Sequence, residues 1–99
     1  MTTRVDADSP VQTGWMVYIV RCADETLYTG VAKQLDGRIA QHSAGKGAKY
    51  TRSRLPVTLV YSEPAEDRSS AQRREGQIKR MPVAAKRQLA ASAGVAAAP

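Results

Sequence analysis

Short runs of hydrophobic residues in the first half of the chain predict a β-hairpin. Residues 15–22 are β-branched and aromatic, which is typical of a mostly buried strand. Residues 27–31 predict a second strand, and the polar segment 23–26 predicts the turn between the two. A third strand is predicted over residues 57–62, and Pro64 is expected to break the chain after it.

The hydrophobic spacing becomes helical over residues 35–43. Leu35 and Ile39 lie four residues apart, as do Arg38 and His42, so each pair shares a face of the predicted helix.

A second helix is predicted to begin after Asp67 or Ser69, either of which suits an N-cap, and to run to about residue 81. Pro82 ends this helix or opens the next one, which is predicted over residues 83–91.

The order β-β-α-β-α-α predicts an α/β fold in which a small three-stranded sheet is flanked by helices. A chain of 99 residues suits one domain, which we expect over residues 15–91. Residues 1–14 are expected to form a flexible arm, and the alanine-rich residues 92–99 a disordered tail.

Composition excludes several classes of protein. The single cysteine, Cys22, excludes an internal disulfide, and one cysteine with one histidine argues against a structural zinc site. No run approaches the roughly 20 apolar residues of a membrane span, and residues 1–14 lack the apolar core of a signal peptide. We therefore expect a cytoplasmic monomer without membrane association.

The charge of the chain favours a polyanionic partner. Fifteen Lys and Arg against nine Asp and Glu give a formal net charge of +6, which favours nucleic acid ahead of a membrane surface. The basic side chains concentrate in residues 33–54 and 68–87, and these two stretches are expected to form one positive surface beside the sheet.

Tyr18 and Tyr28 are candidate site residues on the two hairpin strands. We expect them to share one face, through a connecting loop of odd length or one bulge, since a regular loop of even length would put them on opposite faces. The alternative is that each is an ordinary core or edge residue. Gly30 lets a phosphate or a ring approach the backbone closely, or it marks a bulge.

Arg38, His42 and Glu75 add charge and proton-transfer chemistry. Where their helix face meets the tyrosines, Arg38 can hold a phosphate oxygen and His42 can relay a proton near neutral pH; otherwise they are a solvated pair. Glu75 is expected to face the sheet, either in an ion pair with a neighbouring arginine or as a ligand of Mg²⁺ held mainly by water and substrate phosphate.

The glycine- and lysine-rich residues 44–54 predict a loop without the P-loop pattern. We expect it to follow a nucleic-acid backbone, with Tyr50 available for stacking, rather than to be merely a mobile solvated loop. The residues expected to contact nucleic acid are Gly30, Lys33, Lys46, Lys49, Tyr50, Arg52, Arg54, Arg74 and Lys79.

Taken in order, these residues resemble the GIY-YIG endonuclease superfamily. Met16-Val17-Tyr18 stands where the first signature triplet would be, and Tyr28-Thr29-Gly30 where the second would be. Arg38 follows Tyr28 by ten residues, as the family's arginine does, with His42 one turn later and Glu75 on a later helix. The similarity to the small stand-alone bacterial branch, largely uncharacterised proteins, extends over residues 45–52, 59–62 and 73–79.

The resemblance implies a domain that hydrolyses phosphodiester bonds with one divalent metal ion, Mg²⁺ or Mn²⁺, bound by Glu75. In that scheme Tyr18, helped by His42, takes a proton from the attacking water. Arg38 stabilises the charged transition state, and Tyr28 orients the phosphate or the water.

We therefore expect an endonuclease acting on branched, nicked or single-stranded DNA in repair or recombination, with DNA favoured over RNA. The sequence leaves two alternatives. One is a nucleic-acid-binding domain that does not cut, and the other is a basic scaffold protein of a nucleoprotein assembly.

Overall fold

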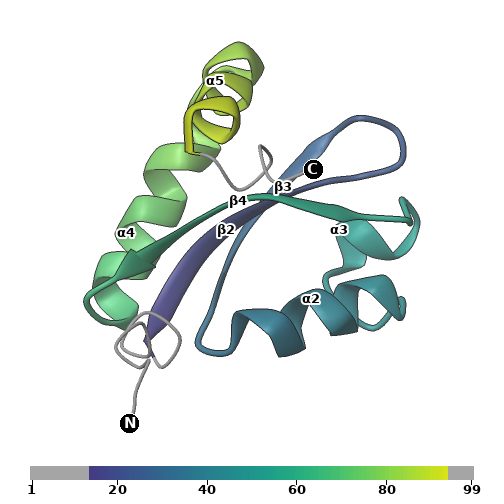
Figure 1. Cartoon of the computed structure of the whole chain (residues 1–99), viewed down its shortest axis with the longest axis horizontal. Coiled ribbons are helices and arrows are strands. Elements are labelled where there is room, and N and C mark those ends of the chain that lie inside the picture. The colour runs from purple at the N-terminus through teal and green to yellow at the C-terminus, as the bar shows by residue number, and fades with distance from the viewer. Residues whose placement is uncertain (1–13, 94–99) are drawn as a thin grey trace, which may run out of the picture.

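The computed structural model describes residues 14–93, which form a three-stranded sheet with helices on both faces (Figure 1). The strands are β2 (Trp15–Arg21), β3 (Leu27–Ala32) and β4 (Thr58–Ala65), in the order β3-β2-β4, and both outer strands run antiparallel to β2. The helices are α2 (Leu35–Ser43), α3 (Lys49–Arg52), α4 (Arg68–Lys79) and α5 (Val83–Ala93). The predicted α/β fold and the order β-β-α-β-α-α are confirmed, with the short α3 as an addition.

None of the helices in this part of the chain is long and apolar enough to cross a bilayer.

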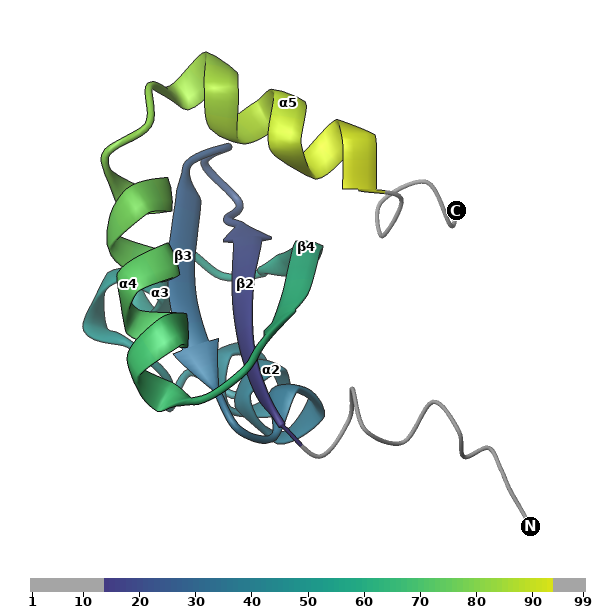
Figure 2. The same cartoon turned by 90° about the vertical axis from the view of Figure 1, so that its left-hand side faces the viewer.

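The central strand β2 is buried on both faces, and each face packs against a different helix. Val17 and Ile19 belong to a core cluster that includes Ile78 of α4. Val20 belongs to a second cluster, to which Leu35 of α2 contributes. Consequently α4 and α2 lie on opposite sides of the sheet, as the two perpendicular views show (Figures 1 and 2).

Local signals in the sequence set the ends of α4 and α5. The carboxylate of Asp67 accepts a hydrogen bond from the Ser70 backbone N–H at 2.7 Å, so the expected N-cap is present. Pro82 directly precedes α5, where its missing N–H costs nothing. Helix α5 continues to Ala93, two residues into the predicted tail. Residues 1–13 of the predicted arm and 94–99 of the tail lie outside the described residues.

The prediction that Pro64 ends the third strand is wrong, because β4 continues to Ala65. In the described part of the chain β4 pairs only with β2, so the nitrogen of Pro64 can face away from the ladder without loss of a hydrogen bond. A register shift opposite Ile19 and Val20 also brings the adjacent residues Val60 and Tyr61 into the same core cluster.

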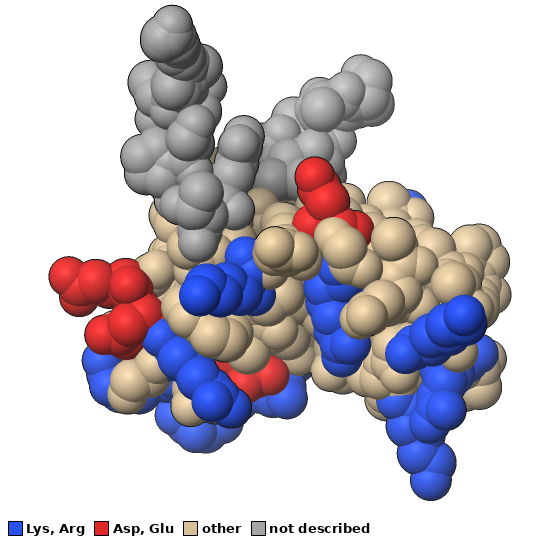
Figure 3. All heavy atoms as spheres, turned by 90° about the horizontal axis from the view of Figure 1, so that it is seen from below, with Lys and Arg blue, Asp and Glu red and all other residues tan. Residues whose placement is uncertain are grey.

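Residues 44–54 are not entirely a loop, because residues 49–52 form the single turn of α3. Figure 3 shows Lys and Arg side chains in several groups on the face that it presents. That the basic residues of 33–54 and 68–87 form one positive surface stays a prediction.

The core packing predicts a contrast between two apolar residues on successive helices. Ile78 is fully buried and Val83 is 54% exposed. Ile78→Ala should lower the free energy of unfolding by about 2–5 kcal/mol, since it leaves a cavity. Val83→Ala should change it by less than about 0.5 kcal/mol. Urea denaturation measures both, and equal effects would contradict the packing of α4 on the sheet.

Candidate active site

Tyr18 and Tyr28 lie on the same face of the hairpin, the face that α2 covers. Across β2 and β3, Tyr18 pairs with Gly30, and Val20 pairs with Tyr28. The loop between the strands spans residues 22–26 and has the odd length that was predicted to place both rings on one side.

His42, in the last turn of α2, connects the two tyrosines. Its Nε2 lies 2.8 Å from the Tyr18 hydroxyl oxygen. Its ring meets both phenol rings edge-on, with centroid distances of 5.8 Å to Tyr18 and 5.6 Å to Tyr28. Tyr18 and His42 are both fully buried, whereas Tyr28 is partly exposed. The predicted helix face therefore does meet the tyrosines.

A threonine on α3 fixes which nitrogen of His42 carries the proton. The Thr51 hydroxyl donates its single hydrogen to the carbonyl oxygen of Ala48, at 2.9 Å. Thr51 Oγ1 therefore accepts at its 2.9 Å contact with His42 Nδ1, and Nδ1 must carry the hydrogen. In a neutral imidazole this leaves Nε2 as an acceptor, so the Tyr18 hydroxyl donates to it.

The electrostatics of the pair agree with this assignment. Burial lowers the pKa of His42 below its usual value of 6.5, and the positive charge of Arg38 lowers it further, so the imidazole is neutral at pH 7. Burial raises the pKa of the Tyr18 phenol above 10, although the neighbouring Arg38 guanidinium opposes this shift. Tyr18 is thus a protonated donor beside a neutral acceptor.

Two glycines allow these rings to sit where they do. A Cβ at Gly30 would lie 2.5 Å from the Tyr18 hydroxyl oxygen and 2.7 Å from the ring carbon that bears it. A Cβ at Gly47 would overlap His42 Nδ1 and lie 2.8 Å from Cε1 of the ring. Of the two possibilities for Gly30, close approach or a bulge, the structure has close approach of the Tyr18 ring in a regular ladder.

Glu75 reaches the site from α4 on the other side of the sheet. One of its carboxylate oxygens forms an ion pair with Lys79 Nζ at 3.2 Å, and the side chain is 22% exposed. Lys79 Nζ also lies 5.9 Å from the centre of the Tyr28 ring. The ion pair expected with an arginine is therefore made with a lysine, at the β3 edge of the sheet.

The residues around Glu75 suit a weakly held hard cation. Residues 14–93 contain no group of three or more His, Cys, Asp or Glu side chains that could hold a metal ion. A cation at Glu75 would therefore take one carboxylate from the protein and its other ligands from water and phosphate. Mg²⁺ commonly binds in this way, so the donor set fits.

Arg38 lines an open groove at the end of β3 and is near enough to Tyr18 to influence the pKa of its phenol. Its guanidinium donates to the side-chain oxygen of Gln41 at 3.0 Å, and its side chain is partly exposed. Lys33 lines the same groove, so two cations border it. The arrangement suits a phosphate held by Arg38 and Lys33.

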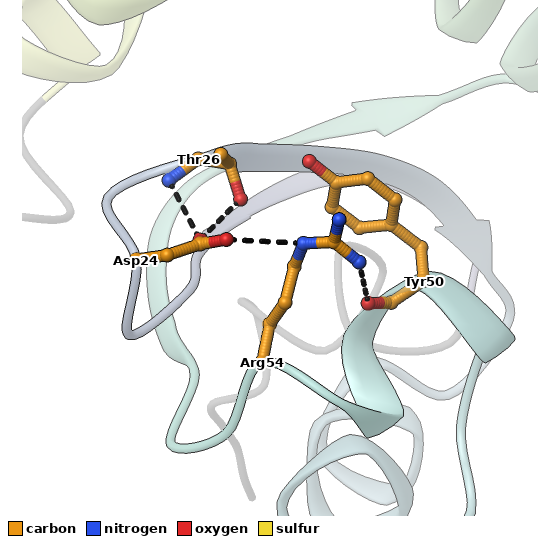
Figure 4. Close-up of polar contacts among 4 residues, drawn as sticks. All are labelled: Asp24, Thr26, Tyr50 and Arg54. Carbon is orange, nitrogen blue, oxygen red and sulfur yellow. Dashed lines mark hydrogen bonds and ion pairs between the residues drawn. The ribbon is translucent and has the colours of Figure 1, made fainter.

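The outer wall of the site is Tyr50, which Arg54 holds in place (Figure 4). Arg54 donates to the Tyr50 carbonyl oxygen at 2.9 Å, and its guanidinium carbon lies 3.9 Å above the Tyr50 ring. It also pairs with Asp24 of the hairpin turn at 3.1 Å. Hydrogen bonds from Thr26, with the charge of Arg54, hold the pKa of Asp24 below its ordinary value. The Tyr50 ring in turn stacks on Tyr28 at 5.9 Å.

Several residues expected to contact nucleic acid lie apart from this cluster. Arg74 donates to both carboxylate oxygens of Glu63 on β4, at 3.0 and 3.2 Å, and Glu63 also accepts from the Tyr61 hydroxyl. Arg74 is therefore committed to a partner at the β4 edge, whereas Glu75 lies at the β3 edge. The exposed cations of the 44–54 segment are Lys46, Lys49 and Arg52.

Sequence reasoning missed three residues that build the site. Thr51 fixes the His42 tautomer, Gly47 makes room for the imidazole, and Asp24 anchors Arg54. Gly47 could have been identified from the sequence, because a glycine in a loop often marks a place where another group approaches the backbone closely. Thr51 and Asp24 carried no such signal.

The packing at Gly47 predicts opposite effects of the same substitution at two glycines. Gly47→Ala should displace His42 and lower the free energy of unfolding by roughly 1–3 kcal/mol, as overpacking does. Gly37→Ala, at an exposed position of α2 with no atom within 4 Å of the new Cβ, should raise it by about 0.5–1 kcal/mol. Thermal or urea unfolding tests both, and a stabilising Gly47→Ala would contradict the contact.

Burial of neutral His42 predicts a pH dependence of stability. The unfolded chain binds a proton near pH 6.5 but the folded chain only at lower pH, so the free energy of unfolding should fall as pH drops from 7 through 6.5 towards the folded pKa. His42 is the only histidine, and Asp24 and Asp67 titrate below pH 3.8, outside this window. The His42→Gln variant should lose the dependence in urea melts at pH 5–7.5; an unchanged slope would contradict it.

Comparison with known proteins identifies the family to which the chain is similar. Residues 14–87 match the GIY-YIG catalytic domain. A UPF0213 protein of Desulfotalea psychrophila is 52% identical over 87 residues, covering 87% of this chain and 76% of the relative. A UPF0213 protein of Natronomonas pharaonis is 51% identical over 75 residues, covering 76% and 88%.

A solved structure supports the same assignment. The solution NMR structure of a UPF0213 protein from Bacillus halodurans is 40% identical, covers 78% of this chain and 82% of its own, and has a TM-score of 0.51. The matching region includes both tyrosine triplets, Arg38, His42 and Glu75. The chain therefore belongs to the GIY-YIG family, a nuclease superfamily, and within it to the UPF0213 proteins.

Proposed function

We propose that this protein is a metal-dependent endonuclease that hydrolyses phosphodiester bonds in DNA, with branched, nicked or single-stranded DNA as its substrate. Membership of the GIY-YIG family supports nuclease chemistry and nucleic-acid binding at the coarser level. The observation that carries the specific proposal is the hydrogen bond from Tyr18 to neutral His42. The His42 ring also contacts Tyr28 on the edge strand β3, near which α4 brings Lys79 and its partner Glu75.

The proton path runs from water to His42 through Tyr18. As the water oxygen forms its bond to phosphorus, a water proton passes to the Tyr18 oxygen, and the phenol proton passes to His42 Nε2. The relay uses Tyr18 in its protonated form, so its raised pKa is no obstacle. The Thr51 hydroxyl accepts from Nδ1 throughout and stabilises the imidazolium that forms.

Arg38 has two functions in this scheme. Tyr18 is fully buried, so water reaches its hydroxyl only when a neighbouring side chain moves. Arg38 lies beside the phenol, and it is free to leave Gln41 for a phosphate oxygen when DNA enters the groove. This movement uncovers Tyr18 and places a positive charge on the scissile phosphate, where negative charge develops. Tyr28, partly exposed, orients the phosphate or the water from the other side.

GIY-YIG nucleases generally use divalent metal ions, and Glu75 would hold the ion here. A bound Mg²⁺ or Mn²⁺ supplies positive charge that stabilises the leaving oxygen. Lys79 Nζ contacts one carboxylate oxygen of Glu75, so the second oxygen would be available to hold the ion.

Two observations favour the alternative, a domain that binds nucleic acid without cutting. The full burial of Tyr18 and the ion pair between Glu75 and Lys79 describe a site that is stable without substrate. In that alternative the tyrosine, histidine and threonine act as a core network, and the basic groove alone meets the nucleic acid.

Cleavage distinguishes the two functions. With Mg²⁺ or Mn²⁺, the purified protein should cut at least one member of a panel of branched, nicked and single-stranded DNA and matched RNA. Glu75→Gln should lower the cleavage rate by at least about 100-fold while affinity and unfolding stability remain near wild type, because the group lost acts on the transition state. Glu66→Gln, at an exposed position just before α4, is the matched control. Gel analysis of labelled strands, with chelator as a second control, measures the rate.

Two outcomes would contradict the proposal. If no substrate is cut with either ion while binding is salt-dependent, the binding domain is the better description. If affinity is independent of salt, nucleic acid is not the partner and a scaffold role follows, because each phosphate contact should contribute a slope of about −0.9 in log affinity against log salt.

A further inference from the structure

A groove outside the candidate active site lies between the hairpin turn and α5. It has a volume of about 370 Å³. Helix α5 crosses the end of the sheet at which β3 begins, so the turn and the helix form opposite walls (Figure 2). The lining residues that matter here are Asp24, Leu27, Tyr50, Val83, Lys86 and Arg87.

The apolar part of this groove is unusual for the molecule. Among residues 14–93, Tyr50 and Val83 are the large hydrophobic side chains that remain exposed, at 37% and 54%. They come from α3 and α5, yet both line this one groove. Single exposed hydrophobic residues need no explanation, but two that converge in one concave site point to a ligand with an apolar face.

The charged residues of the groove are distributed unevenly between its two walls. Lys86 and Arg87 provide two positive charges on the α5 wall. On the hairpin-turn wall the charge of Asp24 is balanced by its ion pair with Arg54, and Glu25 adds a carboxylate that repels an anion. A ligand with one anionic end would therefore place that end at α5, and its apolar face towards the hairpin turn.

Tyr50 is held in place as an ordered wall of the groove before any ligand binds. Arg54 fixes both its backbone and its ring, and Tyr28 packs against the ring. A ring that is already ordered loses little conformational freedom on binding, which favours affinity. The same stack joins the groove to the candidate active site, because Tyr28 also contacts His42.

We propose that this groove binds one unpaired nucleotide of the substrate, with its base against Tyr50 and Val83 and its phosphate at Lys86 and Arg87. A groove with an apolar wall beside two cations suits an unpaired base and its phosphate, whereas a base held inside a duplex cannot enter it. The inference rests on the proposed function in taking DNA as the substrate, and it narrows that substrate to DNA with an unpaired nucleotide beside the scissile bond.

Binding measured without cleavage tests the inference. In the presence of chelator, fluorescence anisotropy should give an affinity for duplex DNA with a single-stranded overhang about tenfold higher than for a blunt duplex of equal length. Val83→Glu should remove most of this preference. The new acid occupies the first residue of α5, where a negative charge is favourable, so the unfolding stability should be unchanged.

Two double variants distinguish binding in the groove from a general effect of positive charge on DNA affinity. Lys86→Ala with Arg87→Ala should lower affinity for the overhang substrate by about tenfold and affinity for the blunt duplex by less than about threefold. The control, Arg68→Ala with Arg73→Ala, removes two charges from the start of α4 and should affect both substrates equally. A 5-iododeoxyuridine in the overhang should photo-cross-link to Tyr50. Peptide mapping identifies the cross-linked residue.

The inference is overturned if both double variants weaken both substrates equally, or if the cross-link maps to a residue outside the groove. Its outcome is separable from that of the proposed function. Loss of cleavage in Glu75→Gln bears only on catalysis, whereas the overhang preference is measured with no metal ion present. A protein that prefers overhangs but never cuts would retain the groove and lose the nuclease proposal.

Discussion

The site depends on one chain of hydrogen bonds, from Tyr18 on β2 through His42 on α2 to Thr51 on α3. All three side chains are fully buried, so each polar atom must find its partner inside the protein. The carbonyl oxygen of Ala48 ends the chain and thereby sets the direction of every hydrogen in it. A fold that positions these three elements correctly also directs the hydroxyl of a buried phenol towards an acceptor nitrogen.

The narrow sheet explains how residues from opposite faces meet. Helix α2 packs on one face and α4 on the other, yet Lys79 of α4 lies over the ring of Tyr28, which belongs to the α2 face. This is possible because β3 is an edge strand. Side chains from the helices on the two faces can meet around that edge, since no further strand separates them. The candidate site is therefore at a margin of the sheet, open to a ligand much larger than the protein.

Local patterns in the sequence predicted the scaffold well. The expected odd hairpin loop put Tyr18 and Tyr28 on one face, helical spacing paired Arg38 with His42, and Asp67 capped α4 as expected. The loop is odd because Cys22, predicted to end the first strand, lies in it. Local patterns could not identify partners distant in sequence. Arg54 and Arg74 looked like free cations, but Asp24 and Glu63 bind them across 30 and 11 residues. A one-turn helix such as α3 shows no periodicity, so the role of Thr51 was also hidden.

The close approach of Tyr18 to Gly30 has a consequence for motion inside the domain. A phenol pressed against a backbone and enclosed on all sides cannot rotate about its own axis until the surrounding layers separate. The two edges of this ring should therefore exchange slowly and give distinct signals in a magnetic-resonance spectrum. Their interchange rate would report how often the core opens around Tyr18, the residue that the proposed proton path requires water to reach.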